Sequence, residues 1–170
     1  SLITELDKKQ LLLCDQAKHG LPYPELHLKS HRYIFEILES HGILKSIQAD
    51  EAIDRQLTWN FYPHGLGHQL GIQVHDVAGQ QSDCYGAPGE PHDRFPKLRT
   101  TRTLETGMVI TIEPGIYFIK SLLDKARNSD NAKHFDWKLI DELSPCGGIR
   151  IEDNILIQGQ STRNLTREHL

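Results

Sequence analysis

Apolar residues recur at helical spacing through the first third of the chain. A first amphipathic helix is set by leucines separated by charged residues, namely Leu2, Leu6 and Leu13. Gly20 follows as its stop signal. A second helix is predicted from about Pro24, which a first turn tolerates, to Gly42. Its buried stripe is predicted to comprise Leu26, Tyr33, Ile34, Ile37 and Leu38.

A short third helix is predicted over residues 47–57, with Ala49, Ala52, Ile53 and Leu57 facing inward. After Trp59 the pattern changes from helical to strand-like. Strands are predicted at residues 70–77, 107–118 and 149–157. A loop rich in proline and glycine fills residues 85–100, and a connection over residues 121–148 holds one helical piece at 136–143. Helices first and strands later predict an α+β domain, with helices on one face of a largely antiparallel sheet.

Composition narrows the class of protein without identifying an activity. The 170 residues are 38% hydrophobic and 25% charged, which predicts one globular domain over residues 1–170. The net charge of −4 argues against a nucleic-acid partner. No apolar run approaches the roughly 20 residues of a membrane span, and the first residues do not resemble a signal peptide. The three cysteines, Cys14, Cys84 and Cys146, are predicted to be free thiols of a cytoplasmic protein.

Three histidines gather in residues 61–76, "FYPHGLGHQLGIQVHD": His64, His68 and His75. A His-x-x-x-His pair on a helix would present both rings on one face. Gly65 and Gly67 lie inside the pair, however, and each costs about 1 kcal/mol in a helix interior. A loop or strand edge is therefore predicted, with Gly71 at a bulge or close backbone approach before a strand resumes. Metal ligands and ordinary surface histidines both remain open interpretations.

Two glutamates lie on predicted strands. In "GMVITIEPGIYF", alternation puts Thr111 and Glu113 on one face, and Pro114 follows. In "GGIRIEDNILI", Arg150 and Glu152 share a face. Taken alone, each glutamate is more simply interpreted as an ordinary exposed residue of a strand. One imidazole and two carboxylates together, however, suit Mn²⁺, Co²⁺ or Zn²⁺, and strands would hold them rigidly.

Three segments carry a family resemblance, in this order: "PHGLGHQLGIQVHD", "LETGMVITIEPGIYF" and "GGIRIEDNILI". They resemble the catalytic domain of the pita-bread metallopeptidases, which include methionine aminopeptidase, aminopeptidase P and Xaa-Pro dipeptidase. The bacterial Xaa-Pro dipeptidase branch is the most similar, along nearly the whole chain. The resemblance implies the C-terminal part of a pita-bread fold and hydrolysis of the Xaa-Pro bond of dipeptides. A homodimer is implied for the full-length enzyme, and the charge and the lack of a long apolar run predict no nucleic-acid or membrane partner.

The resemblance also implies roles for particular residues. His68, Glu113 and Glu152 match the family's metal ligands, and His64 and His75 match pocket histidines that bind no metal. Arg150 matches an arginine that positions substrate. The implied cofactors are two divalent ions sharing a bridging hydroxide, with Mn²⁺ expected first and Co²⁺ or Zn²⁺ as alternatives. Glu113 is expected to carry a proton to the leaving nitrogen, and His75 to stabilise the oxyanion.

One departure from the family pattern is large. Two aspartate ligands of the family fall upstream of the first helix, and Asp83 and Asp93 do not match them in order. The chain is therefore expected to be the C-terminal part of a longer enzyme, with little activity alone. Three alternatives remain: an aminopeptidase P-like specificity, a non-catalytic interaction module, and a fortuitous His-rich metal binder.

Overall fold

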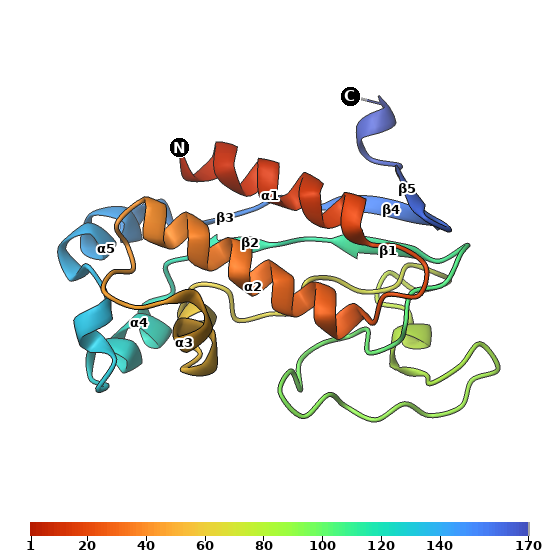
Figure 1. Ribbon diagram of the computed structural model, residues 1–170, viewed down its shortest axis with the longest axis horizontal. Helices are drawn as coiled ribbons and strands as arrows, with labels where there is room; N and C mark the ends of the chain where they lie inside the picture. The colour runs from red at the N-terminus through yellow and green to blue at the C-terminus, as the bar shows by residue number, and fades with distance from the viewer. Residues whose placement is uncertain (170) are drawn as a thin grey trace. The chain divides into compact units, whose positions relative to one another are not determined.

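The fold is that of a computed structural model, which describes residues 1–169 (Figure 1). The chain separates into two compact units. Unit 1 comprises Ser1–Asp7, His31–Pro63 and Gly115–Arg150. Unit 2 comprises Lys8–Ser30, His64–Pro114 and the residues from 151 onward. The single domain predicted for residues 1–170 stays a prediction.

The two long predicted helices are confirmed as α1 (Leu2–Gln16) and α2 (Tyr23–Ser40). Gly20 and Gly42 follow them with φ of +87° and +72°, left-handed values that glycine adopts without steric cost. The predicted stripe of α2 is buried except for Tyr33, which is half-buried. The third predicted helix is divided into α3 (Ala49–Asp54) and a 3₁₀ turn, η1 (Leu57–Asn60), since Gln56 between them is left-handed.

Unit 2 contains a three-stranded sheet in the order β1-β4-β5. Its strands are β1 (Val109–Ile112), β4 (Asp153–Gln158) and β5 (Ser161–Asn164), and both pairings are antiparallel. Ile110, Ile155 and Ile157 are fully buried. Two helices are tied to β1: Gln10 Nε2 of α1 donates to the Ile112 carbonyl at 3.2 Å, and Tyr23 Oη of α2 donates to the Thr111 carbonyl at 3.2 Å. The predicted antiparallel sheet with helices against it is confirmed.

Unit 1 contains a second, two-stranded antiparallel sheet of β2 (Gly115–Tyr117) and β3 (Gly148–Arg150). The connection between these strands holds α4 (Lys120–Arg127), η3 (Ala132–His134), α5 (Trp137–Leu143) and η4 (Ser144–Cys146). Helix α5 confirms the helical piece predicted at 136–143, whereas α4 was not predicted. The aromatic core centres on Phe61, whose ring centroid lies 5.9 Å from that of Phe118 and 6.0 Å from that of Phe135.

The strand predictions require three corrections. The predicted strands at 107–118 and 149–157 are each divided in two, at residues 113–114 and 151–152. The first break has a clear cause, because Pro114 has no N–H to donate. The predicted strand at 70–77 is wrong: residues 71–76 form a loop in which Ile72 and Val74 are exposed, and η2 (Val77–Gln80) follows. The Asp76 N–H donates to the Gln69 carbonyl at 3.1 Å and so folds the segment back on itself.

The remaining expectations concern irregular segments and thiols. Residues 85–100 form a loop without helix or strand, as predicted, and η5 (Arg167–His169) ends the described chain. Cys14 is buried, Cys84 and Cys146 are exposed, and all three are free thiols, as predicted. Within residues 1–169, no helix has both the length and the apolar character that a membrane crossing requires.

Candidate metal centre

Three potential metal ligands converge within unit 2. His68, Glu113 and Glu152 each offer one ligand atom, and these atoms lie within 4.8 Å of one another. The first two side chains are buried, with 4% and 8% of their residue surface exposed, whereas Glu152 is open to solvent. A metal ion bound by two buried side chains and one exposed side chain would remain accessible to a substrate from the exposed side.

Strand register brings the two glutamates together. Strands β1 and β4 are antiparallel, and Ile112 lies opposite Asp153. Glu113 directly follows β1 and Glu152 directly precedes β4, so the two glutamates are the next residues beyond this pair. Just beyond them, the Ile151 N–H donates to the Pro114 carbonyl at 3.3 Å. Because opposed residues of an antiparallel pair lie about 5 Å apart, a 39-residue separation in sequence becomes a single carboxylate pair.

A second segment delivers His68 to the other edge of β1. Residues 66–70 run antiparallel to this strand through three backbone bonds of 2.8–2.9 Å, which join Glu113 to Leu66, Thr111 to His68 and Leu70 to Val109. The approach requires Gly67: an added Cβ would lie 2.1 Å from the Thr111 carbonyl oxygen. The predicted loop or strand edge is confirmed, and this glycine lets the histidine backbone reach the strand.

Hydrogen bonds orient the ligand atoms. His68 Nδ1 lies 3.0 Å from the Gln69 carbonyl, which can only accept, so Nδ1 carries the proton and Nε2 presents its lone pair. Nε2 lies 3.5 Å from Glu113 Oε1. The buried Thr111 hydroxyl accepts from the His68 N–H at 3.0 Å and donates to Glu113 Oε1 at 3.2 Å. Thr111 thus connects two of the three ligands.

His75 lies beside the metal-ligand group. Its ring centroid is 4.3 Å from that of His68, at an interplanar angle of 81°. Desolvation lowers the pKa of His75, positive charge on His68 and Arg99 acts in the same direction, and Glu152 opposes them. The neutral imidazole that results can donate or accept a hydrogen bond toward a bound molecule.

Asp76 holds the loop that carries His75. Its carboxylate accepts hydrogen bonds from the Ala78 N–H at 2.9 Å and from the Gln73 N–H at 3.4 Å. These two bonds hold the pKa of Asp76 below its ordinary value. Gly71 is required here as well, because an added Cβ would lie 2.3 Å from Asp76 Oδ2. The close approach predicted at Gly71 is therefore confirmed, but the approaching group is the Asp76 side chain. The strand predicted to follow Gly71 is absent from the described residues 71–76.

The other two predicted pocket residues have different surroundings. His64 is half-buried in unit 2, and its Nδ1 donates to the Gly65 carbonyl at 2.7 Å. Arg150 belongs to unit 1, where its Nε donates to Tyr117 Oη at 2.6 Å and its guanidinium carbon lies 5.6 Å from the ring centroid. The roles predicted for His64, His75, Glu113 and Arg150 in catalysis stay predictions.

Sequence reasoning did not identify Thr111, although one signal was available. The alternation in residues 107–118 places Thr111 on the same face as Glu113, two positions away. Asp83, which sequence reasoning left out of the site, accepts from the Tyr85 and Ala87 N–H groups at 2.8 and 3.1 Å and forms a turn.

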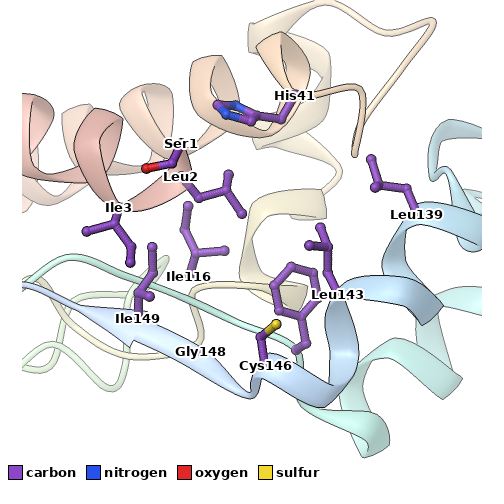
Figure 2. Close-up of a pocket in the computed structure, with 11 residues that line it drawn as sticks. Ser1, Leu2, Ile3, His41, Ile116, Leu139, Leu143, Cys146, Gly148 and Ile149 are labelled. Atoms are coloured by element: carbon purple, nitrogen blue, oxygen red, sulfur yellow. The ribbon is translucent and has the colours of Figure 1, made fainter.

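The cavity of Figure 2 is a different kind of site. It lies in unit 1, has a volume of about 460 Å³, and is lined almost entirely by apolar side chains. Leu2, Ile116 and Ile149 point into it from α1, β2 and β3, and Cys146 lies on its wall. It contains none of the predicted ligands, and its walls offer no carboxylate to a cation.

The donor set of unit 2 does fit a divalent ion. One imidazole nitrogen and two carboxylates form a borderline-to-hard set, and carboxylate charge offsets that of the metal. The three residues can supply at most about five ligand atoms, since each carboxylate has two oxygens. A candidate metal site is therefore present, and its ligands do not specify which metal.

Comparison with known proteins shows which sequences this chain resembles. The sequence pattern of metallopeptidase family M24 matches residues 2–159. The chain is 47% identical to the Xaa-Pro dipeptidase of Pectobacterium carotovorum over 167 residues, 98% of the chain. It is also 47% identical to that of Photorhabdus laumondii over 168 residues, 99% of the chain. The chain spans 38% of the length of each of these curated relatives.

Solved structures extend the comparison to the fold. Escherichia coli aminopeptidase P with the inhibitor Pro-Leu is 27% identical, with a TM-score of 0.65 over 99% of this chain and 32% of that one. Pseudomonas aeruginosa aminopeptidase PepP is 25% identical, with a TM-score of 0.64 over 97% of this chain and 30% of that one. The α+β architecture predicted from the sequence is that of the C-terminal part of a pita-bread fold. With its motifs, fold and sequence in agreement, the chain belongs to metallopeptidase family M24.

Proposed function

We propose that this chain forms part of the catalytic centre of an Xaa-Pro dipeptidase, with His68, Glu113 and Glu152 as metal ligands. The observation that carries the proposal is the convergence of these three donor groups within 4.8 Å. The 47% identity to Xaa-Pro dipeptidases over nearly the whole chain supports the choice of substrate class, a dipeptide with C-terminal proline.

The proposed cofactors are two divalent ions, with Mn²⁺ first and Co²⁺ or Zn²⁺ as alternatives. Two ions with five or six ligands each need roughly ten coordination positions, some of them shared. The five ligand atoms of His68, Glu113 and Glu152 fill about half. We therefore propose that these residues complete a two-metal centre only with ligands from elsewhere, and that the chain alone hydrolyses Xaa-Pro dipeptides poorly.

When bound, such ions would supply an acidified water and polarise the scissile carbonyl. The protein groups have complementary tasks. Glu113 is proposed to take a proton from the attacking water and give it to the prolyl nitrogen, which becomes the leaving amine. His75, neutral through its lowered pKa, is proposed to donate a hydrogen bond to the carbonyl oxygen as negative charge develops. His64 is proposed to line the substrate pocket.

Substrate recognition must accommodate a tertiary amide, because an Xaa-Pro bond has no N–H. The enzyme must then recognise its substrate by the proline ring and by the free carboxylate of the dipeptide. A guanidinium suits a carboxylate because its N–H groups form two parallel hydrogen bonds with it. Arg150 is proposed for this task, with Tyr117 holding it through the 2.6 Å bond to Oη.

A second specificity has support of its own. Similar solved structures include Escherichia coli aminopeptidase P with the inhibitor Pro-Leu, with substrate and with product bound. An aminopeptidase P-like chain would accept peptides that continue beyond the proline. The higher identity to dipeptidases, 47% against 27%, favours the dipeptide.

Metal binding can be tested on this chain directly by calorimetric titration with Mn²⁺ and Zn²⁺. We expect Glu113→Ala and Glu152→Ala to abolish tight binding, because each removes a charged ligand. His64→Ala serves as the matched control and should bind as the native chain does. Binding that survives both glutamate substitutions would instead identify a fortuitous histidine site and refute the proposal.

Specificity can be tested in a chimera, in which this chain replaces the matching 38% of the Pectobacterium carotovorum dipeptidase. We expect the folded chimera to hydrolyse Ala-Pro with Mn²⁺ and to leave Ala-Pro-Ala intact, with Glu113→Gln as the inactive control. Cleavage of Ala-Pro-Ala would favour the aminopeptidase P alternative. A folded chimera that cleaves neither peptide would refute a peptidase function for this segment.

A further inference from the structure

A buried carboxylate lies directly next to a proposed metal ligand. Asp153 follows Glu152 in the chain and begins β4, and only 3% of its surface is exposed. Its Oδ2 accepts two hydrogen bonds of 2.7 Å, one from Asn164 Nδ2 and one from Arg167 Nε. Burying a carboxylate is costly unless a cation and hydrogen bonds compensate, and here the C-terminal segment supplies both.

Arg167 is also connected to β1, the strand that precedes Glu113. Its terminal NH2 nitrogen donates to Gln10 Oε1 at 3.2 Å, and Gln10 Nε2 donates to the Ile112 carbonyl at 3.2 Å. Ile112 immediately precedes Glu113. One guanidinium therefore contacts the residue after Glu152 directly, and reaches the residue before Glu113 through a single amide.

The backbone around Arg167 is itself fixed. Asn164 Oδ1 accepts from the N–H groups of Thr166 and Arg167 at 3.2 and 3.0 Å, which orders the turn after β5. The Leu165 N–H donates to the Asn154 carbonyl at 2.8 Å and joins this turn to β4. The guanidinium is thus presented to the two ligand strands by a structured segment.

A neighbouring thiol contributes no charge to this network. Burial raises the pKa of Cys14 to about 12, and the nearby charge of Asp153 acts in the same direction. Gln10 Nε2 lies 3.3 Å from its Sγ. Cys14 is therefore neutral at physiological pH, and the negative charge that Arg167 offsets is that of Asp153.

We infer that Arg167 is a positioning residue for the metal site, which holds the ends of β1 and β4 so that Glu113 and Glu152 converge. The inference rests on the proposed metal-binding function. Arginine suits the task because its planar fork donates in two directions at once, which the single ammonium of lysine does not reproduce. Arg167 lies outside residues 2–159, the segment that the family pattern matches.

The test is calorimetric titration of Mn²⁺ into the full chain carrying Arg167→Met. Groups that orient metal ligands without touching the metal contribute about 10- to 100-fold in affinity, and we expect a loss in that range. Arg167→Lys keeps the charge beside Asp153 and should recover part of the loss. Arg163→Met is the matched control: Arg163 lies on β5 and pairs with Glu168 at the surface, so affinity should change less than twofold.

A second measurement separates positioning from stability alone. The visible absorption of the Co²⁺-loaded chain depends on coordination geometry, and we expect Arg167→Met to change this spectrum at saturating metal while Arg163→Met leaves it unchanged. If Arg167→Met does not fold, Gln10→Met takes its place. That variant removes the hydrogen bonds of the Gln10 amide to Ile112, Arg167 and Cys14, keeps the ion pair of Arg167 with Asp153, and should weaken Mn²⁺ binding at least fivefold.

The outcomes distinguish this inference from the proposed function. A native chain that binds neither Mn²⁺ nor Zn²⁺ overturns the metal site, and the role of Arg167 with it. Native binding that Glu152→Ala abolishes, but that a folded Arg167→Met or Gln10→Met retains within twofold with an unchanged Co²⁺ spectrum, overturns the positioning role alone.

Discussion

At the scale of single residues, the candidate site depends on how closely two backbones approach at Gly67. The segment over residues 66–70 follows β1 through three backbone hydrogen bonds. A Cβ on Gly67 would lie 2.1 Å from the Thr111 carbonyl oxygen and 2.7 Å from Tyr23 Oη. The nearest obstacle is backbone, which cannot move without disrupting the pairing that delivers His68.

Gly67→Ala should therefore destabilise the chain by about 2–3 kcal/mol, the upper range for overpacking a rigid site. Urea denaturation without metal measures the change. Gly107→Ala is the comparison: its Cβ meets nothing within 4 Å, but its φ of +95° should still cost about 1 kcal/mol. Equal losses in the two variants would show that crowding at Gly67 is not decisive.

Thr111 offers a second residue-scale prediction, because its hydroxyl serves both His68 and Glu113. Thr111→Val keeps the shape but leaves the buried His68 N–H without that acceptor, at a cost of about 1–3 kcal/mol in stability. Mn²⁺ affinity should also fall about tenfold, since the Glu113 carboxylate loses a donor that orients it. Denaturation and calorimetry measure the two effects.

The control for Thr111→Val is Thr103→Val, at an exposed position of the same unit. Its stability should stay within about 0.5 kcal/mol of the native chain, with unchanged metal affinity. A Thr111→Val variant with the stability and metal affinity of this control would show that Thr111 does not orient His68 or Glu113.

At the scale of elements, α2 places an uncharged histidine inside unit 2. His27 is 97% buried, and its ring packs edge-on against Phe95 with centroids 4.6 Å apart. Burial lowers the pKa of His27 to about 3, and positive charge on His64 and His92 acts in the same direction. The neutral form of this ring therefore favours the packing of α2 against the loop that carries Phe95.

This lowered pKa predicts acid sensitivity. Between pH 6.5 and about 3 the unfolded chain binds a proton at His27 that the folded chain does not, so stability falls as pH falls. The loss is about 1.4 kcal/mol for each pH unit well below 6.5. His27→Gln cannot titrate, and its stability should decline less steeply than that of the native chain in urea titrations from pH 7 to 4. Parallel declines would contradict the prediction.

At the scale of the whole molecule, metal and fold should be linked by mass action. The candidate ligands His68, Glu113 and Glu152 meet only when the 66–70 segment and β4 are both paired with β1. An unfolded chain has no such arrangement, so a metal that binds the folded state stabilises it. The candidate site is therefore also a source of stability for unit 2.

Free Mn²⁺ at 100 times its dissociation constant should raise the unfolding free energy by about 2.7 kcal/mol. Thermal denaturation with Mn²⁺ and with EDTA measures the difference. Glu152→Gln should lose most of this stabilisation, whereas Glu142→Gln, an exposed glutamate on α5, should keep it. Equal stabilisation of both variants would place the metal elsewhere.

The sequence by itself determined the local elements and the residue types of the site. Periodicity identified α1, α2 and α5, because the spacing of apolar residues records which side of an element is buried. The glycines between His64 and His68 excluded a helix there. The three family motifs predicted His68, Glu113 and Glu152 as metal ligands, and the structure brings these three side chains together.

Tertiary structure alone decided how those residues are held. The apolar Ile72 and Val74 predicted a strand, but Asp76 closes that segment into an exposed loop. Arg167 meets Gln10 across 157 positions, and Gln10 meets Ile112 across 102. Such partners depend on strand register and on which helix covers which edge, and no local pattern of hydrophobic and polar residues encodes either.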